Sequence, residues 1–171
     1  MNGKSLLLPF VLALAVGLAA HASRAGGEAS EGFEKLKSLA GHWEGESDDD
    51  ATVTADIEVI SGGHSVLEKF VRVEEGRSMN MLTVYYLDGD TLKLTHYCHA
   101  GNQPTMSGRY DPDRGTLTFD LLSATNLKPD DLHMHHAVVT LVDSTHFREA
   151  WTLYKDGKSA GMEILFFSRP K

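Results

Sequence analysis

Histidine is the chemically versatile side chain that this sequence contains in unusual number. The chain has nine histidines among its 171 residues. Imidazole exchanges protons near neutral pH, forms hydrogen bonds and coordinates transition metals. Five of the histidines fall in two short segments of the chain, namely His96, His99, His133, His135 and His136. These two segments are therefore the first place to look for a binding, metal or acid–base site.

Amide, carboxyl and indole side chains accompany the histidines. Asn102 and Gln103 follow the first histidine segment, and Asn126 precedes the second. Glu149 and Trp151 lie two residues apart, so on a strand they share one face. The candidate ligand-binding residues are His96, Asn102, Gln103, Asn126, His133, His135, Glu149 and Trp151. The candidate metal ligands are His96, His133 and His135, and no residue is assigned as catalytic.

The overall charge excludes several classes of partner. Lys and Arg number 16 against 24 Asp and Glu, so the formal charge is −8. A chain this acidic repels phosphate backbones and anionic headgroups, so we expect neither nucleic acid nor a membrane surface as a partner. Cys98 is the single cysteine, so no disulfide can form within the chain. The length and composition predict one packed domain.

The N-terminus has the pattern of a secretory signal peptide. Lys4 precedes an apolar run, and small residues at Ala20 and Ala22 suit cleavage after Ala22, with Ala25 as the second choice. We therefore expect residues 1–22 to be a signal peptide, 23–32 a flexible leader and 33–171 the folded domain. The mature protein is then exported, periplasmic or secreted, without membrane insertion once the signal has been removed.

Turn signals divide the rest of the chain into short, β-rich runs. Phe33, Leu36 and Leu39 have helical spacing, which predicts a short helix. Nine Gly-, Asp- or Pro-containing turns follow, starting at Asp48–Asp50 and ending at Asp156-Gly157. Evenly spaced short strands of this kind indicate an antiparallel meander, and closing the meander removes its edges. We expect an all-β, up-and-down barrel of about ten strands, with the helix closing one end; a two-sheet sandwich is the alternative.

Alternation predicts which side chains face the barrel interior. Leu92 and Leu94 share a face with His96 and Cys98, so both polar residues should point inward. Phe147 and Leu153 share a face with Glu149 and Trp151, so Glu149 and Trp151 should also point inward. The run 133–143 is apolar on both faces, so its facing stays undetermined.

Several motifs resemble known barrel families. Gly41-His42-Trp43 after a short helix, with Arg169 near the end of the last strand, resembles the lipocalin-like (calycin) barrels. That resemblance implies that Trp43 packs beneath Arg169 at the closed end. Gly41-x-Trp43-x-Gly45 is also similar to the opening of nitrobindin-type haem barrels. Their glycine-rich stretch is replaced here by Ser47–Asp50, and no histidine after His146 matches their axial haem ligand.

Four further segments resemble an exported bacterial family of lipocalin-like proteins without assigned activity. These segments are Leu94–Cys98, Gly101–Pro104, Ala124–Asn126 and His133–His135. The resemblance implies the barrel fold and adds no activity.

Alternating turns bring the two histidine segments to the same barrel end, opposite Trp43. Four interpretations of this mouth remain open. Its polar side chains could simply pack the rim, or the mouth could be a cavity for a partly apolar ligand, walled by Leu92, Leu94, Phe147 and Trp151. It could also be a metal or haem site that uses His133, His135 and His96 or His99, or the site of a hydrolase or isomerase that uses histidine with Glu149. We expect an exported, monomeric or homodimeric protein that binds a small molecule and has no obligatory cofactor, with metal or haem binding as the alternative.

Overall fold

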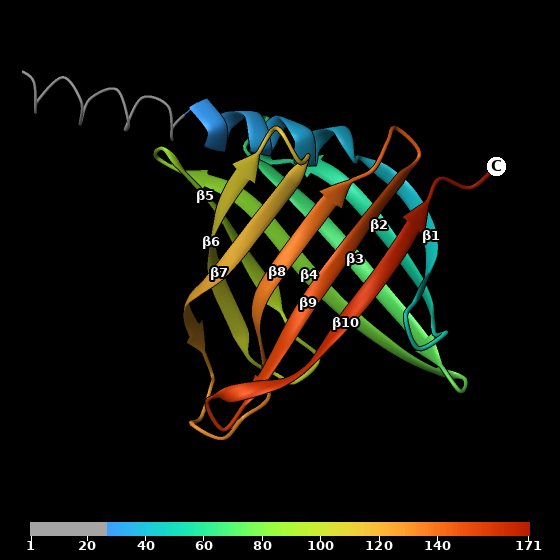
Figure 1. The fold of residues 1–171 in the computed structure, drawn as a ribbon, viewed down its shortest axis with the longest axis vertical. Coiled ribbons are helices and arrows are strands. Elements are labelled where there is room, and N and C mark those ends of the chain that lie inside the picture. Colours follow the sequence, from blue (N-terminus) through green and yellow to red (C-terminus); the bar gives the residue numbers. More distant parts are fainter. Residues whose placement is uncertain (1–26) are drawn as a thin grey trace, which may run out of the picture.

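The computed structural model describes residues 27–171 (Figure 1). The expected signal peptide, residues 1–22, lies outside the described residues, as do residues 23–26 of the expected leader. Ten strands follow one another along the chain, with one 3-10 turn, η1 (Ser61–Gly63), between the second and the third. The strands are β1 (Gly41–Ser47), β2 (Thr52–Ile60), β3 (Ser65–Glu74), β4 (Arg77–Asp88), β5 (Thr91–Tyr97), β6 (Gln103–Asp111), β7 (Thr116–Thr125), β8 (His133–Leu141), β9 (His146–Lys155) and β10 (Lys158–Ser168).

Every strand pairs with its neighbours in sequence, and β1 pairs with β10 to close the barrel. All pairs are antiparallel, and the closing pair aligns Glu44 with Ser168 and Ser47 with Leu165. Each of the nine turn signals lies between two consecutive strands. The expected ten-stranded up-and-down barrel is thereby confirmed, and the sandwich alternative is wrong.

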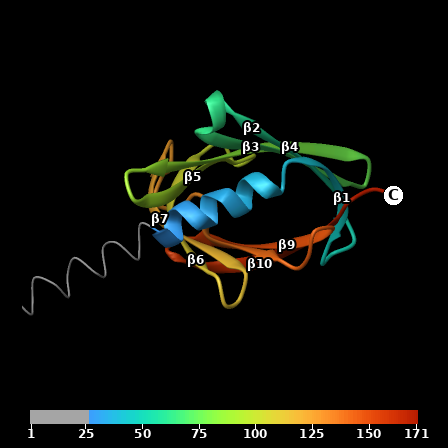
Figure 2. The same cartoon turned by 90° about the horizontal axis from the view of Figure 1, so that it is seen from above.

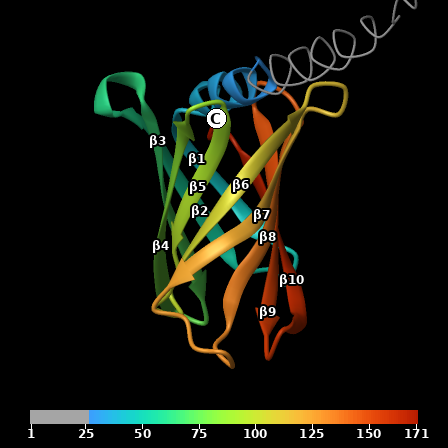
Figure 3. The ribbon, with the colours of Figure 1, turned by 90° about the vertical axis from the view of Figure 1, so that its left-hand side faces the viewer.

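One helix, residues 27–38 as described, lies across one end of the barrel (Figures 2 and 3). Its Ala29, Phe33 and Leu36 side chains are buried, at helical spacing. Gly32 allows close approach, because a Cβ there would come within 2.8 Å of the Tyr110 Cβ atom. The expectation of a flexible leader up to residue 32 is wrong for residues 27–32, because the apolar face extends back to Ala29. Within residues 27–171, no helix has the length and apolar character needed to cross a membrane.

Trp43 and Arg169 close the helix end. The Arg169 guanidinium carbon lies 3.8 Å from the centre of the Trp43 ring, and its Nη2 atom donates a 2.9 Å hydrogen bond to the Ala40 carbonyl. The Trp43 indole donates a 2.7 Å hydrogen bond to the carbonyl of Leu39. Phe147 meets the indole edge-on at 4.7 Å. The contact expected between Trp43 and Arg169 is present, and it joins both chain ends of the barrel to the helix.

The interior facing agrees with the alternation on two strands, β5 and β9. Leu92, Leu94 and His96 on β5 are buried, as are Phe147, Glu149 and Trp151 on β9. The facing of β8, which the sequence leaves undetermined, changes at a bulge between Met134 and His136. Met134 and Ala137 both point inward across that bulge, since they pair with Leu153 and Trp151 on the inward face of β9.

Candidate functional site

The barrel is open at the end opposite the helix, where a cavity of about 520 Å³ lies between the strand ends and turns. Figure 3 shows the turns of this end, including β7–β8 and β9–β10, on the far side of the barrel from the helix. The cavity is lined by Asp48, Asp49, Arg72, Glu74, Met79, Met81, Cys98, His99, Ala100, Leu132, Met134, Leu153, Met162 and Glu163. Its volume lies within the range of pockets that hold small organic molecules.

Thioether side chains make up much of the apolar wall. Met79, Met81, Met134 and Met162 all line the cavity, which is four of the six methionines in the chain. Methionine is unbranched and polarisable, so it adapts its shape to an apolar guest. Leu92, Leu94 and Phe147, which the sequence suggested as the wall, are packed into the core and do not line this cavity. That expectation is wrong because core side chains fill the helix half of the barrel.

A buried arginine organises the charged side of the cavity. Arg72 on β3 donates 2.6 Å hydrogen bonds to Asp49 and to Glu163, and a 3.3 Å bond to Glu74. The hydrogen bond from Arg72 lowers the pKa of Asp49 to about 2. Burial raises the pKa of Glu163 despite its bond to Arg72. The guanidinium is therefore held by three carboxyl groups, which come from the β1–β2 turn, β3 and β10.

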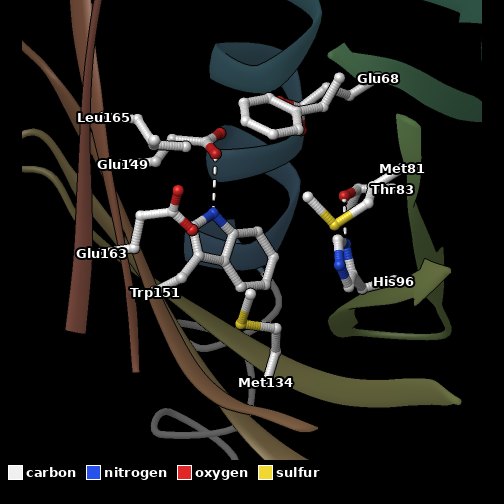
Figure 4. Close-up of a pocket in the computed structure, with 10 residues that line it drawn as sticks. Glu68, Met81, Thr83, His96, Met134, Glu149, Trp151, Glu163 and Leu165 are labelled. Atoms are coloured by element: carbon white, nitrogen blue, oxygen red, sulfur yellow. Dashed lines mark hydrogen bonds between the residues drawn. The ribbon is translucent and has the colours of Figure 1, made fainter. Parts of the chain in front are cut away.

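A pair of buried carboxyl groups lies deeper in the barrel. Glu68 accepts a 2.8 Å hydrogen bond from the Tyr85 hydroxyl. Glu149 accepts a 2.8 Å bond from the Trp151 indole, which Figure 4 shows. The two carboxyl groups lie close enough for each to influence the pKa of the other. Desolvation raises the pKa of both, and the repulsion between them adds to the shift of Glu149. Burial and mutual repulsion both disfavour two ionised carboxylates here, so the pair favours a state that keeps at least one proton.

His96 lies beside this pair, and one of its two ring nitrogens has no hydrogen-bond partner. Its Nδ1 atom lies 3.0 Å from the Thr83 hydroxyl, while its buried Nε2 atom has no hydrogen-bond partner. The imidazole packs against the Trp151 indole at 4.9 Å. Desolvation lowers the pKa of His96 to about 4, so the ring is neutral at physiological pH. The space enclosed by His96, Trp151 and the glutamates is only about 10 Å³, which is room for about one water molecule.

The three candidate amides connect the loops of the rim. Asn102 donates a 2.8 Å hydrogen bond to the Leu132 carbonyl. Asn126 and Gln103 donate to the Gly101 carbonyl at 2.6 and 3.1 Å. The bonds of Asn102 and Asn126 tie the β5–β6 connection to the β7–β8 connection, whereas the bond of Gln103 stays within the β5–β6 side. The structure therefore brings the amides together at the mouth, with their donor groups directed at loop backbone.

His133 and His135 lie on the outer face of the barrel. Their rings approach within a 3.2 Å contact between Nε2 of His133 and Nδ1 of His135, and His135 stacks on Tyr154 at 3.9 Å. Tyr154 follows the inward-facing Leu153, so it points outward. The two histidines share a face as expected, but they are not inside the mouth with His96. The bulge in β8 is the physical reason, because it places Met134 inward and the imidazoles outward.

The expected metal ligands do not meet. His96 lies inside the barrel, whereas His133, although only 8% exposed, and His135 pack with Tyr154 on the other face of β8 and β9. Within residues 27–171, no group of three or more His, Cys, Asp or Glu side chains is arranged to hold a metal ion. His99 lines the cavity, and Cys98 beside it is half-buried, with burial raising its thiol pKa.

One further pattern in the sequence, Gly157-Lys158-Ser159-Ala160-Gly161, matches the G-x-S-x-G form of a nucleophile elbow. In the structure it occupies the β9–β10 hairpin, where Ser159 is exposed and pairs with Tyr154. A nucleophile elbow requires a strand-to-helix turn. The pattern is therefore a hairpin here.

Arg72, Glu68 and Glu163 are among the polar interior residues that the sequence analysis did not select. On β3 the inward face carries Val66 and Phe70, and the outward face carries Leu67 and Val71. Because both faces are apolar, alternation alone does not show that Glu68 and Arg72 point inward. The signal that was available is the spacing of Glu163 from Leu165 and Phe167, which both face the core.

Comparisons with known proteins indicate the fold. No protein-family model matches the chain, and no curated protein is similar to it in sequence at a significant level. The crystal structure of Rv2717c from M. tuberculosis is similar with a TM-score of 0.64 and 11% identity, over 82% of this chain and 98% of that one. A protein of unknown function of the DUF3598 family, from Nostoc punctiforme, is similar with a TM-score of 0.55 and 14% identity. That match covers 79% of this chain and 49% of the DUF3598 protein, so this chain spans about half of its length. Both neighbours support a lipocalin-like barrel fold.

Proposed function

We propose that this protein is an exported binding protein that holds a small, partly apolar molecule in the mouth cavity. The observation that carries the proposal is the cavity of about 520 Å³, open at one barrel end. Its methionine and leucine wall suits an apolar guest, and the charged groups around Arg72 suit a polar one. Export is proposed from the signal-peptide pattern of residues 1–22.

The packing of the barrel is consistent with a binding role rather than a catalytic one. The groups best suited to acid–base chemistry, Glu149 and His96, lie beneath the cavity floor, around a space of about 10 Å³. That space holds about one water molecule, so it is too small for an organic substrate. The open volume lies above, where the wall is mostly apolar.

A neutral fluorescent probe tests the proposal. N-phenyl-1-naphthylamine brightens when it leaves water for an apolar site, so titration of the purified protein should give saturable, one-to-one binding. Leu153→Trp places an indole in the cavity and should weaken probe binding by tenfold or more. Val142→Trp is the matched control, because Val142 is exposed and lies between β8 and β9 at the helix end.

Far-UV circular dichroism checks that each variant is folded, so a loss of probe binding can be told apart from a loss of folding. Saturable binding that Leu153→Trp removes and Val142→Trp preserves supports the cavity as the site. A folded wild-type protein that binds no probe, or equal binding by both variants, overturns the proposal.

A further inference from the structure

The mouth cavity carries an excess of negative charge. Four carboxyl groups line it, from Asp48, Asp49, Glu74 and Glu163. Among the described lining residues, Arg72 is the one side chain with a permanent positive charge. The apolar wall lowers the local dielectric constant, which strengthens the field of these charges inside the cavity.

The single guanidinium is already engaged. Arg72 is buried and donates hydrogen bonds to Asp49, Glu74 and Glu163. A ligand carboxylate or phosphate entering the cavity would meet a guanidinium that three carboxyl groups surround. It would have to displace one of them or add a fourth anion to the cluster. Anionic amphiphiles such as fatty acids are therefore disfavoured.

Hydrogen-bond acceptors continue below the cavity floor. Glu163, Met81 and Met134 line both the cavity and the small space beneath it. Figure 4 shows the Glu163 carboxyl beside the Trp151 indole, with Met134 below the ring. When Nδ1 of His96 donates its proton to Thr83, the unpartnered Nε2 is a bare, neutral acceptor. Carboxyl and imidazole acceptors, together with the face of an indole ring and an apolar wall, are surroundings that suit a protonated amine.

We infer that the molecule held in the mouth cavity is an amphiphilic amine, with an apolar body and one positively charged nitrogen. The apolar body lies against the methionines, and the nitrogen lies at the Asp49–Glu163 side of the cavity. This inference rests on the proposed function, since it names the chemical class of the ligand for the same cavity.

Three ligands with the same ten-carbon chain test the inference: decylamine, decanol and decanoate. Each is titrated against the mature protein at pH 7, and displacement of N-phenyl-1-naphthylamine reports its binding. We expect decylamine to bind about tenfold more tightly than decanol, and decanoate to bind least tightly. Raising the salt concentration from 20 to 500 mM should weaken decylamine binding and leave decanol binding unchanged.

Variants that remove one negative charge from the cavity test whether the preference for decylamine arises there. Glu163→Gln should reduce the preference for decylamine over decanol several-fold, with the decanol affinity unchanged. Asp48→Asn is a second variant of the same kind at an exposed position, and asparagine keeps the Oδ1 atom that accepts a hydrogen bond from the Ile164 amide. Glu75→Gln is the control, because Glu75 is exposed in the β3–β4 turn and does not line the cavity.

The proposed function and the inference of an amine ligand can be disproved separately. If none of the three ligands displaces the probe and the probe itself does not bind, the proposed function is wrong. If decanol or decanoate binds as tightly as decylamine, the cavity binds ligands but the inference of an amine is overturned. The same holds if Glu75→Gln changes the preference as much as Glu163→Gln does.

Discussion

Burial raises the pKa of both Glu149 and Glu68 inside the barrel, which makes the stability of the fold depend on pH. An ionised pair is costly to bury, so the folded state keeps the proton at a pH where the unfolded chain, with the ordinary glutamate pKa of 4.5, has released it. The folded protein then binds more protons than the unfolded chain above pH 4.5. The contribution of the pair to stability is therefore full below this pH and is lost as the pH rises through the folded-state pKa values.

The variant Glu149→Gln tests this carboxyl pair. Glutamine keeps an oxygen that can accept the hydrogen bond from Trp151 and cannot ionise. We expect its free energy of unfolding to depend less on pH between 4.5 and 8, and to exceed that of the wild type at pH 8 by about 1 kcal/mol or more. Urea unfolding at several pH values measures both. The opposite contribution of His96, whose pKa is lowered to about 4, is present in both proteins and cancels in the comparison. Parallel pH profiles would contradict a proton retained by the pair.

Trp43 lies at the centre of the packing at the closed end of the barrel. It is 1% exposed and contacts the helix, Phe147 and Arg169. Trp43→Ala should lower the free energy of unfolding by about 3–5 kcal/mol, the usual cost of truncating a buried aromatic side chain. Urea denaturation measures the loss, and Tyr97→Ala, at a position that is 48% exposed, is the control. Equal midpoints for Trp43→Ala and the wild type would show that the end does not depend on this side chain.

At the scale of the element, the bulge in β8 separates the two histidine segments. It turns His133 and His135 toward Tyr154 on the outside and leaves Met134 facing the cavity. The double variant His133→Ala, His135→Ala should therefore bind N-phenyl-1-naphthylamine within twofold of the wild type. The lost stacking on Tyr154 should cost about 0.5–1.5 kcal/mol of stability. Probe titration and urea unfolding measure the two effects.

Leu153→Trp serves as the positive control in that experiment, because Leu153 precedes Tyr154 on β9 and faces the cavity. Loss of probe binding in the double alanine variant, with folding intact, would show that the imidazoles belong to the binding site.

At the scale of the whole molecule, the proposed export has a direct test. Residues 1–22 should be absent from the protein recovered from the periplasm or the medium after expression of the full chain in a bacterial host. Intact-mass measurement should then give a chain that begins at Ser23 or at Gly26. Lys4→Glu, which removes the positive charge before the apolar run, should slow this processing. An uncleaved chain that stays in the cytoplasm would remove export from the proposed function.

The sequence by itself determined the barrel, because the signals for it are local. A Gly or Asp turn depends on the dihedral angles of a few residues, and interior facing on β5 and β9 follows from a period of two. The same alternation placed Glu149 and His96 inside, and the resemblance of Gly41-His42-Trp43 and Arg169 to lipocalin-like barrels implied the closed end.

The tertiary structure alone decided what the mouth contains. Strands β3 and β8 are apolar on both faces, so their sequences do not show that Arg72 points inward or that a bulge turns His133 outward. The methionine wall and the ring of carboxyl groups around Arg72 come from strands distant in the chain, such as β3 and β10. Their meeting depends on how side chains from opposite sides of a closed barrel fill its cross-section, which no local period encodes.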